Sequence, residues 1–508
     1  MAAASTFNPL ARPGGPAGIL QPGRPSASTL AANPLFSLGY RLTLLCVFIL
    51  VGRMPEVTVV LLGSSLYQVT LLITILLPLA IITGVVVKVG ATRIGMFWTA
   101  FHLWVMLTLP LSGYRMGSLE TFSGLMRLLP ITFYVGGFFV RSIEMLRKGT
   151  WAMAWAGIAG LAWMEHTGVV EGEDRFSSVG TFGNSNLLAI YLLMMVPFWG
   201  IITANSRYRW ITRLFFAGAI LAALSMVLKT GSRSGLLSIF VLAVPLFFSL
   251  SVANKFKFTV LATLGVIVAL GTMPDTLKSR LGTLFSSERK DEISAEALGS
   301  ADARYALLIE SLQTTMSHPF FGTGLGVYTD VAAREKELRG ERALWQVTHN
   351  MYTQISAETG IPGFILYMTA LILAIKETWR VRKLTKGDPG LYELRLIASG
   401  LLMSYAMFLF NGCFTSMATD FTFYSLMGFS IATSFVYQQL VNQKADADSL
   451  DKPAPAAPTP QPGYYRSPRT LPPPPVSANV PATNGANDDA PWRRNPRKYP
   501  PKPGSPSR

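Results

Sequence analysis

A short polar turn between two apolar stretches carries two cations suited to binding an anion. It reads Lys229-Thr-Gly-Ser-Arg-Ser-Gly235 and places Lys229 and Arg233 beside apolar residues, where desolvating a charge is costly unless it has a partner. A second polar segment, Thr348-His349-Asn350, stands just before another apolar stretch. A guanidinium fork matches phosphate oxygens, and a histidine accepts a proton near neutral pH. If the two segments meet, they form a cationic site at one face of a membrane.

Three further arginines could also bind an anion. Arg175 lies in a stretch rich in Gly, Asn and Ser, whereas Arg280 and Arg304 belong to a long polar loop. Ser300 is expected to N-cap a helix over 301–316, which puts Arg304 in the first turn, the unfavourable end for a cation. Each arginine also has an ordinary explanation, as a side chain that reaches the headgroups or pairs with a nearby carboxylate.

The composition indicates an integral membrane protein. Hydrophobic residues make up 50% of the 508 residues, charged residues only 14%, and the mean hydropathy is +0.37. The net charge of +16 would also suit a nucleic-acid-binding protein, but most Lys and Arg stand in short loops between apolar runs, where they set topology. A lipid bilayer is therefore the expected partner and nucleic acid is not. The histidines and cysteines lack the spacing of a zinc site, so no metal is expected.

The apolar runs predict an all-α polytopic fold with about twelve transmembrane helices. Alternate short loops differ in Lys and Arg content, and the richer set is expected in the cytoplasm together with both termini. A disordered N-terminus is expected over 1–34, a transmembrane domain over 35–442 and a disordered Pro-rich tail over 443–508. Within the domain, the loop 274–354 between helices nine and ten lies outside and carries its own helices, one of them around 334–342.

Four segments, in order along the chain, resemble the O-antigen ligase and O-antigen polymerase membrane proteins. Arg175 to Asn186 resembles the family's segment of arginine, glycine, phenylalanine and two asparagines, and Gly231 to Gly235 resembles its Ser-Arg turn. Arg304 to Gly326 resembles its arginine-bearing loop helix, which is followed by a His-Pro element rich in glycine. His349 to Gly363 resembles its His-Asn segment. Together these segments cover roughly residues 170–380.

The resemblance implies a GT-C-like glycosyltransferase that works without a metal or other cofactor at the periplasmic face of the bacterial inner (plasma) membrane. The donor is a glycan on undecaprenyl diphosphate, and the acceptor is lipid A–core in a ligase or a second lipid-linked glycan in a polymerase. By matching positions, Arg233 and Arg304 hold the diphosphate, and His349 contacts the acceptor hydroxyl or acts as its base. Direct displacement inverts the anomeric centre. The other substrate contacts expected are Arg175, Lys229, Arg280 and Asn350.

Several alternatives stay open at this point. Ligases, polymerases and protein oligosaccharyltransferases share these segments, so the resemblance does not choose among them. A small-solute transporter also fits about twelve helices with an arginine inside one of them, Arg127. A scaffold that recruits partners through its Pro-rich tail is the third class.

Overall fold

The computed structural model describes residues 33–450, apart from short gaps at 55–56, 58–66, 141, 172–174, 179, 250–251, 273–274, 284–291 and 344. Contacts divide the chain into a unit that ends at Ser449 and a second unit from Leu450 onward. The segments expected to be disordered, 1–34 and 443–508, therefore lie almost wholly outside the described residues. The last described helix runs past the expected boundary at Asn442 and ends at Leu450.

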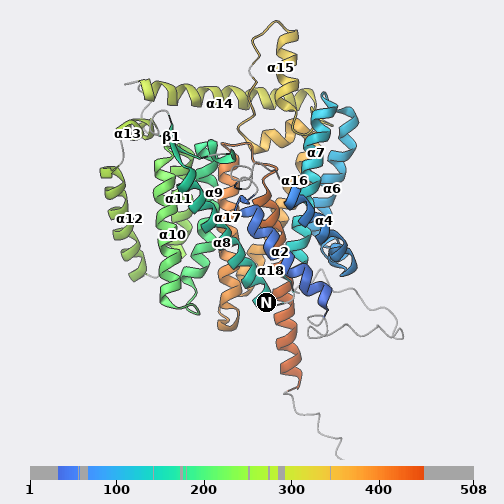
Figure 1. The fold of residues 1–508 in the computed structure, drawn as a ribbon, viewed down its shortest axis with the longest axis vertical. Coiled ribbons are helices and arrows are strands. Elements are labelled where there is room, and N and C mark those ends of the chain that lie inside the picture. The colour runs from blue at the N-terminus through green and yellow to red at the C-terminus, as the bar shows by residue number, and fades with distance from the viewer. Residues whose placement is uncertain are drawn as a thin grey trace, which may run out of the picture. The chain divides into compact units, whose positions relative to one another are not determined.

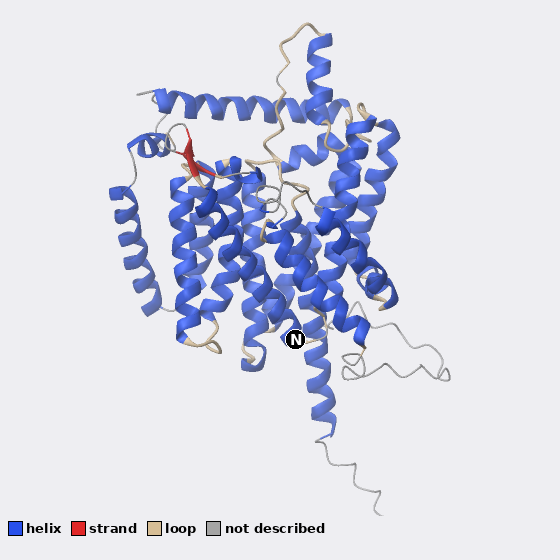
Figure 2. Cartoon of the chain, in the orientation of Figure 1, coloured by secondary structure: helices blue, strands red, loops and turns tan. Residues whose placement is uncertain are grey.

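Helices account for nearly all of the described structure, as Figure 2 shows. The α-helices are α2 (Pro34–Val51), α4 (Tyr67–Ile82), α5 (Val85–Gly90), α6 (Arg93–Thr108), α7 (Arg115–Phe138), α8 (Ile143–Thr167), α9 (Ser185–Ala204), α10 (Trp210–Lys229), α11 (Arg233–Ser249), α12 (Val252–Thr272), α13 (Asp275–Gly282), α14 (Glu292–Ser317), α15 (Tyr328–Leu338), α16 (Met351–Leu384), α17 (Tyr392–Gly412) and α18 (Phe421–Leu450). Three short 3-10 turns are η1 (Leu109–Leu111), η2 (Gly180–Gly183) and η3 (Pro389–Leu391). One antiparallel hairpin joins β1 (Val169–Glu171) to β2 (Arg175–Ser177).

The helices confirm the all-α class expected of a membrane protein. Among the described residues, 6 helical segments are long and apolar enough to cross a membrane. They are Pro34–Val51, Arg93–Leu111, Ser185–Ala204, Trp210–Lys229, Met351–Leu384 and Pro389–Gly412, and the shorter apolar helices are Leu72–Ile82 and Arg233–Phe248. The count of about twelve stays a prediction.

Helix α9 lies at the centre of the described bundle and α10 at its margin. Of the apolar window in α9, 72% is buried, compared with 28% in α10. α9 packs against α8, α10, α11 and α17. The face that α10 leaves uncovered is apolar, with Ile211, Leu214 and Phe215 exposed, as expected for a helix that borders lipid.

The long polar loop is helical, but its helices begin earlier than expected. α14 starts at Glu292 rather than after Ser300, because the preceding stretch is rich in Glu, Ala and Leu and these residues extend the helix. Arg304 therefore lies in the interior of α14 and not in its first turn. α15 likewise begins at Tyr328 and ends at Leu338, before Gly340, whose φ is +73°. Figure 1 shows α14 lying across one end of the bundle, with α15 beyond it.

Helix α16 contains a sharp kink where the chain crosses from the polar loop into the apolar run. Gly360 has φ 72° and ψ 178°, and Pro362 follows it. This backbone conformation is essentially restricted to glycine. The kink divides α16 into a polar first part and a long apolar second part.

Candidate functional site

The turn between α10 and α11 is held by neighbours from α9 and from the β-hairpin. Gly231 makes the turn possible with φ 60°, and Ser232 Oγ accepts from Gly235 N–H at 3.1 Å, which caps α11. Arg175 Nε donates to Thr230 O at 3.2 Å. Ser232 Oγ in turn donates to Asn186 Oδ1 at 2.8 Å. The structure therefore brings the Arg175–Asn186 segment and the turn together.

Arg233 is the first residue of α11 and is half-buried. One of its guanidinium nitrogens lies 3.2 Å from Thr283 Oγ1, just after α13. α13 covers this end of the bundle through Leu277, which is 2% exposed and packs against the side chains of Leu228 and Leu236. The guanidinium is thus positioned between the membrane helices and the polar loop. Arg280 lies in α13, but its side chain falls outside the described part of the structure.

His349 and Asn350 form the link into α16. Asn350 is the N-cap, because its Oδ1 accepts from Tyr352 N–H at 2.9 Å and from Thr353 N–H at 3.1 Å. Its Nδ2 donates to Cys413 O at 3.3 Å. These bonds give Asn350 a structural part in addition to the substrate contact expected of it. His349 precedes the cap with φ 49°, a conformation that is uncommon outside glycine and found at functional sites.

Arg304 and His349 are electrostatic neighbours, although 45 positions separate them in the chain. Both side chains are half-buried. Burial, together with the positive charge of Arg304, lowers the pKa of His349 below its ordinary value. α14 is fixed beside α16 by a buried contact of 2.9 Å between the hydroxyls of Thr315 and Ser356. The imidazole is consequently neutral at pH 7 and can accept a proton.

The glycine-rich segment after α14 docks its backbone onto the kink of α16. Thr323 N–H donates to Ala357 O at 2.8 Å, Gly324 N–H to Glu358 O at 3.0 Å, and Ile361 N–H to Pro319 O at 2.8 Å. The approach is so close that a Cβ on Gly322 would lie 2.4 Å from the Glu358 backbone. This junction explains the glycines of the His-Pro element and fixes the end of α14 that follows Arg304.

The last turn of α17 connects the two halves of the site. Asn411 is fully buried, and its Oδ1 accepts from Ser238 Oγ at 3.1 Å, on the helix that Arg233 opens. Two residues later, Cys413 O accepts from Asn350. Sequence reasoning missed Asn411 and Ser238. A polar amide inside an apolar run is the signal that points to such a residue.

The middle of the chain, from α10 into α16, matches a known protein family. Residues 217–368 match the family model described as O-antigen ligase. This part of the chain is similar to O-antigen ligase. This confirms the family resemblance seen in the sequence. No curated protein matches the chain.

The matched segment contains most of the candidate site. The matched residues 217–368 include Lys229, Arg233, Arg304 and His349. Arg175 and the end of α17 lie outside the match, yet they contact residues within it. Lys229, the last residue of α10, is exposed, and among the described residues no hydrogen bond or ion pair joins it to the other site residues. It lies instead at one end of an apolar groove, with Glu165 of α8.

Proposed function

We propose that this O-antigen ligase family protein transfers a glycan from undecaprenyl diphosphate to an acceptor hydroxyl, with inversion and without a metal. The single observation that carries the proposal is that α14, held against α16 by the 2.9 Å contact of Thr315 with Ser356, brings Arg304 within electrostatic reach of His349. A neutral base beside a fixed cation is suited to a reaction that removes a proton from one group while a second group leaves as an anion.

In this mechanism the arginines bind the leaving group. Cleavage of the glycosyl–phosphate bond leaves negative charge on the diphosphate, and Arg233 and Arg304 stabilise that charge electrostatically. Both belong to helices held by packing, α11 and α14, so little reorganisation accompanies the reaction. Arg175, bonded to the turn at Thr230, adds positive charge next to Arg233.

His349 acts on the acceptor. Its lowered pKa keeps the imidazole neutral, so it takes the hydroxyl proton as the acceptor oxygen bonds to the anomeric carbon. The bond from that carbon to the phosphate oxygen breaks on the opposite face, which inverts the configuration. A bound diphosphate offsets the charge of Arg304 and therefore strengthens His349 as a base when the donor is in place.

The proposed location is the periplasmic face of the bacterial inner membrane, with about twelve spans and both termini in the cytoplasm. The Lys and Arg bias of the short loops supports this orientation. The acceptor is lipid A–core if the protein is a ligase. The second candidate is an O-antigen or exopolysaccharide polymerase, because the same domain and the same residues serve a lipid-linked acceptor.

The test replaces Arg233, Arg304 and His349 singly by Ala in a strain that lacks the chromosomal gene. We expect surface glycan to be lost while the protein level in the membrane stays normal. Arg339→Ala is the matched control, since Arg339 is exposed and pairs only locally with Glu341 at 3.0 Å. Accumulated lipid-linked polymer identifies a ligase and single repeat units identify a polymerase. Normal glycan in all three variants would exclude the proposed function.

A further inference from the structure

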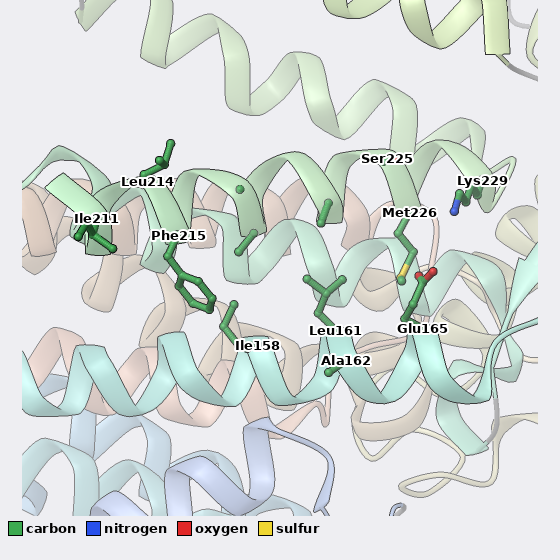
Figure 3. Close-up of a pocket in the computed structure, with 13 residues that line it drawn as sticks. Ile158, Leu161, Ala162, Glu165, Ile211, Leu214, Phe215, Ser225, Met226 and Lys229 are labelled. Atoms are coloured by element: carbon green, nitrogen blue, oxygen red, sulfur yellow. The ribbon is translucent and has the colours of Figure 1, made fainter.

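An apolar groove of about 740 Å³ runs between α8 and α10. Its lining includes Ile158 and Leu161 from α8, and Ile211, Phe215 and Gly218 from α10. Figure 3 shows Phe215 and Met226 of α10 facing Ile158 and Leu161 of α8, with carbon and sulfur between the two helices. The lining is therefore suited to a hydrocarbon chain.

The length of the groove indicates which kind of hydrocarbon chain it can hold. From Ile211 to Lys229 the lining follows 18 residues of α10, which at 1.5 Å per residue is about 27 Å. The hydrocarbon layer of a bilayer is about 30 Å thick, so an acyl chain of one leaflet covers only about half of the groove. A long polyprenyl chain can follow it from end to end.

The charged end of the groove adjoins the candidate site. Figure 3 places Lys229 and Glu165 at the end opposite Ile211. Lys229 directly precedes Thr230, the residue whose carbonyl accepts from Arg175. The ammonium attracts an anionic headgroup, and the carboxylate repels it from the α8 side. A headgroup held at Lys229 therefore lies at the end of α10, four positions before Arg233 in the chain.

We propose that this groove binds the polyprenyl tail of the lipid-linked donor, with Lys229 facing its phosphate. The inference rests on the proposed function and assigns the tail of its donor to a surface outside the catalytic residues. Gly218 lies about 16 Å from Lys229 along α10, so a long chain passes it and a short chain such as geranyl ends before it.

Gly218→Phe tests the groove. A Cβ on Gly218 meets nothing within 4 Å, and Gly218 lines the groove, so we expect the ring to occupy space that the lipid chain would use. Gly265→Phe is the matched control, because Gly265 lies in the apolar helix α12, outside the lining, and is equally open. We expect Gly218→Phe to raise KM for an undecaprenyl donor about tenfold or more, as several methylenes lose their contacts. KM for a geranyl donor and kcat for both donors stay unchanged, as do all values for Gly265→Phe.

Two measurements separate this inference from the proposed function. If both glycine variants have the same KM for the undecaprenyl donor and Arg233→Ala is inactive, the groove does not bind the polyprenyl tail, whereas the proposed function is retained. If Arg233→Ala and His349→Ala keep full transfer, the proposed function is refuted. The role of the groove is then tested by native mass spectrometry, which measures binding of undecaprenyl phosphate to the purified protein. Selective loss of bound lipid in Gly218→Phe supports it, and equal occupancy in the two glycine variants refutes it.

Discussion

Replacing Gly360 by Ala should disrupt the junction between α16 and the glycine-rich segment after α14. A Cβ at this position would lie 2.1 Å from Phe320 O and 2.5 Å from Phe320 C. Both atoms belong to the backbone, so a side-chain rotation cannot relieve the clash. The glycine-rich segment must move away from α16, which breaks backbone hydrogen bonds such as Ile361 N–H to Pro319 O at 2.8 Å.

The expected loss of stability combines two contributions. A non-glycine residue held in the backbone conformation of Gly360 costs about 1–3 kcal/mol. Each backbone hydrogen bond lost at the junction costs about 0.5–1.5 kcal/mol more, and the structure has three of them, donated by Thr323, Gly324 and Ile361. The free energy of unfolding should therefore fall by about 3–7 kcal/mol.

Gly340→Ala provides a control for a non-glycine residue at positive φ without a close backbone contact. Gly340 has φ +73°, almost the same as the +72° of Gly360, but a Cβ there meets nothing within 4 Å. Its loss of stability should be only about 1 kcal/mol. Unfolding of the purified proteins by SDS in mixed micelles, followed by tryptophan fluorescence, measures both values. Transfer activity should fall in Gly360→Ala and persist in Gly340→Ala. Equal destabilisation by the two substitutions would refute the proposed role of the close backbone contact.

The other predictions concern the contacts of His349 and Asn411. Arg304→Met should raise the pKa of His349 toward the ordinary histidine value, because a neighbouring positive charge is removed; an unchanged imidazole titration by NMR would contradict this. In the unsubstituted protein, transfer should fall only when the pH drops below the ordinary histidine pKa, since protonation removes the base. In a double-mutant cycle, Ser238→Ala and Asn411→Leu should couple by about 0.6 kcal/mol, and at most about 1.7. Strictly additive losses would argue against the bond.

Local sequence signals predicted several features well. α14 ends at Ser317, one residue after the end expected from the sequence and just before His318-Pro319, and Ser232 caps α11 at Arg233. Both depend on interactions within a few residues, namely a side-chain cap and the missing N–H of proline. The membrane class likewise follows from apolar runs that are visible without a fold.

The predicted start of α14 was wrong because two local signals competed. Gly299-Ser300 suggested a boundary, but the helix formers before them continue the helix to Glu292. The consequence matters for the site, since the dipole argument for Arg304 depended on its being in the first turn. Its nearness to His349 now supports the assignment instead.

The sequence alone indicated a helical membrane protein with cations at two polar segments, and its residues 217–368 match the O-antigen ligase family model. Only the tertiary structure decided which groups meet. Arg175 reaches Thr230, Asn411 joins Ser238, and Arg304 lies beside His349. The spacing of these partners follows neither helix nor strand periodicity, because packing of whole helices brings them together. Local rules therefore identified the chemical groups, and long-range packing assembled them into a site.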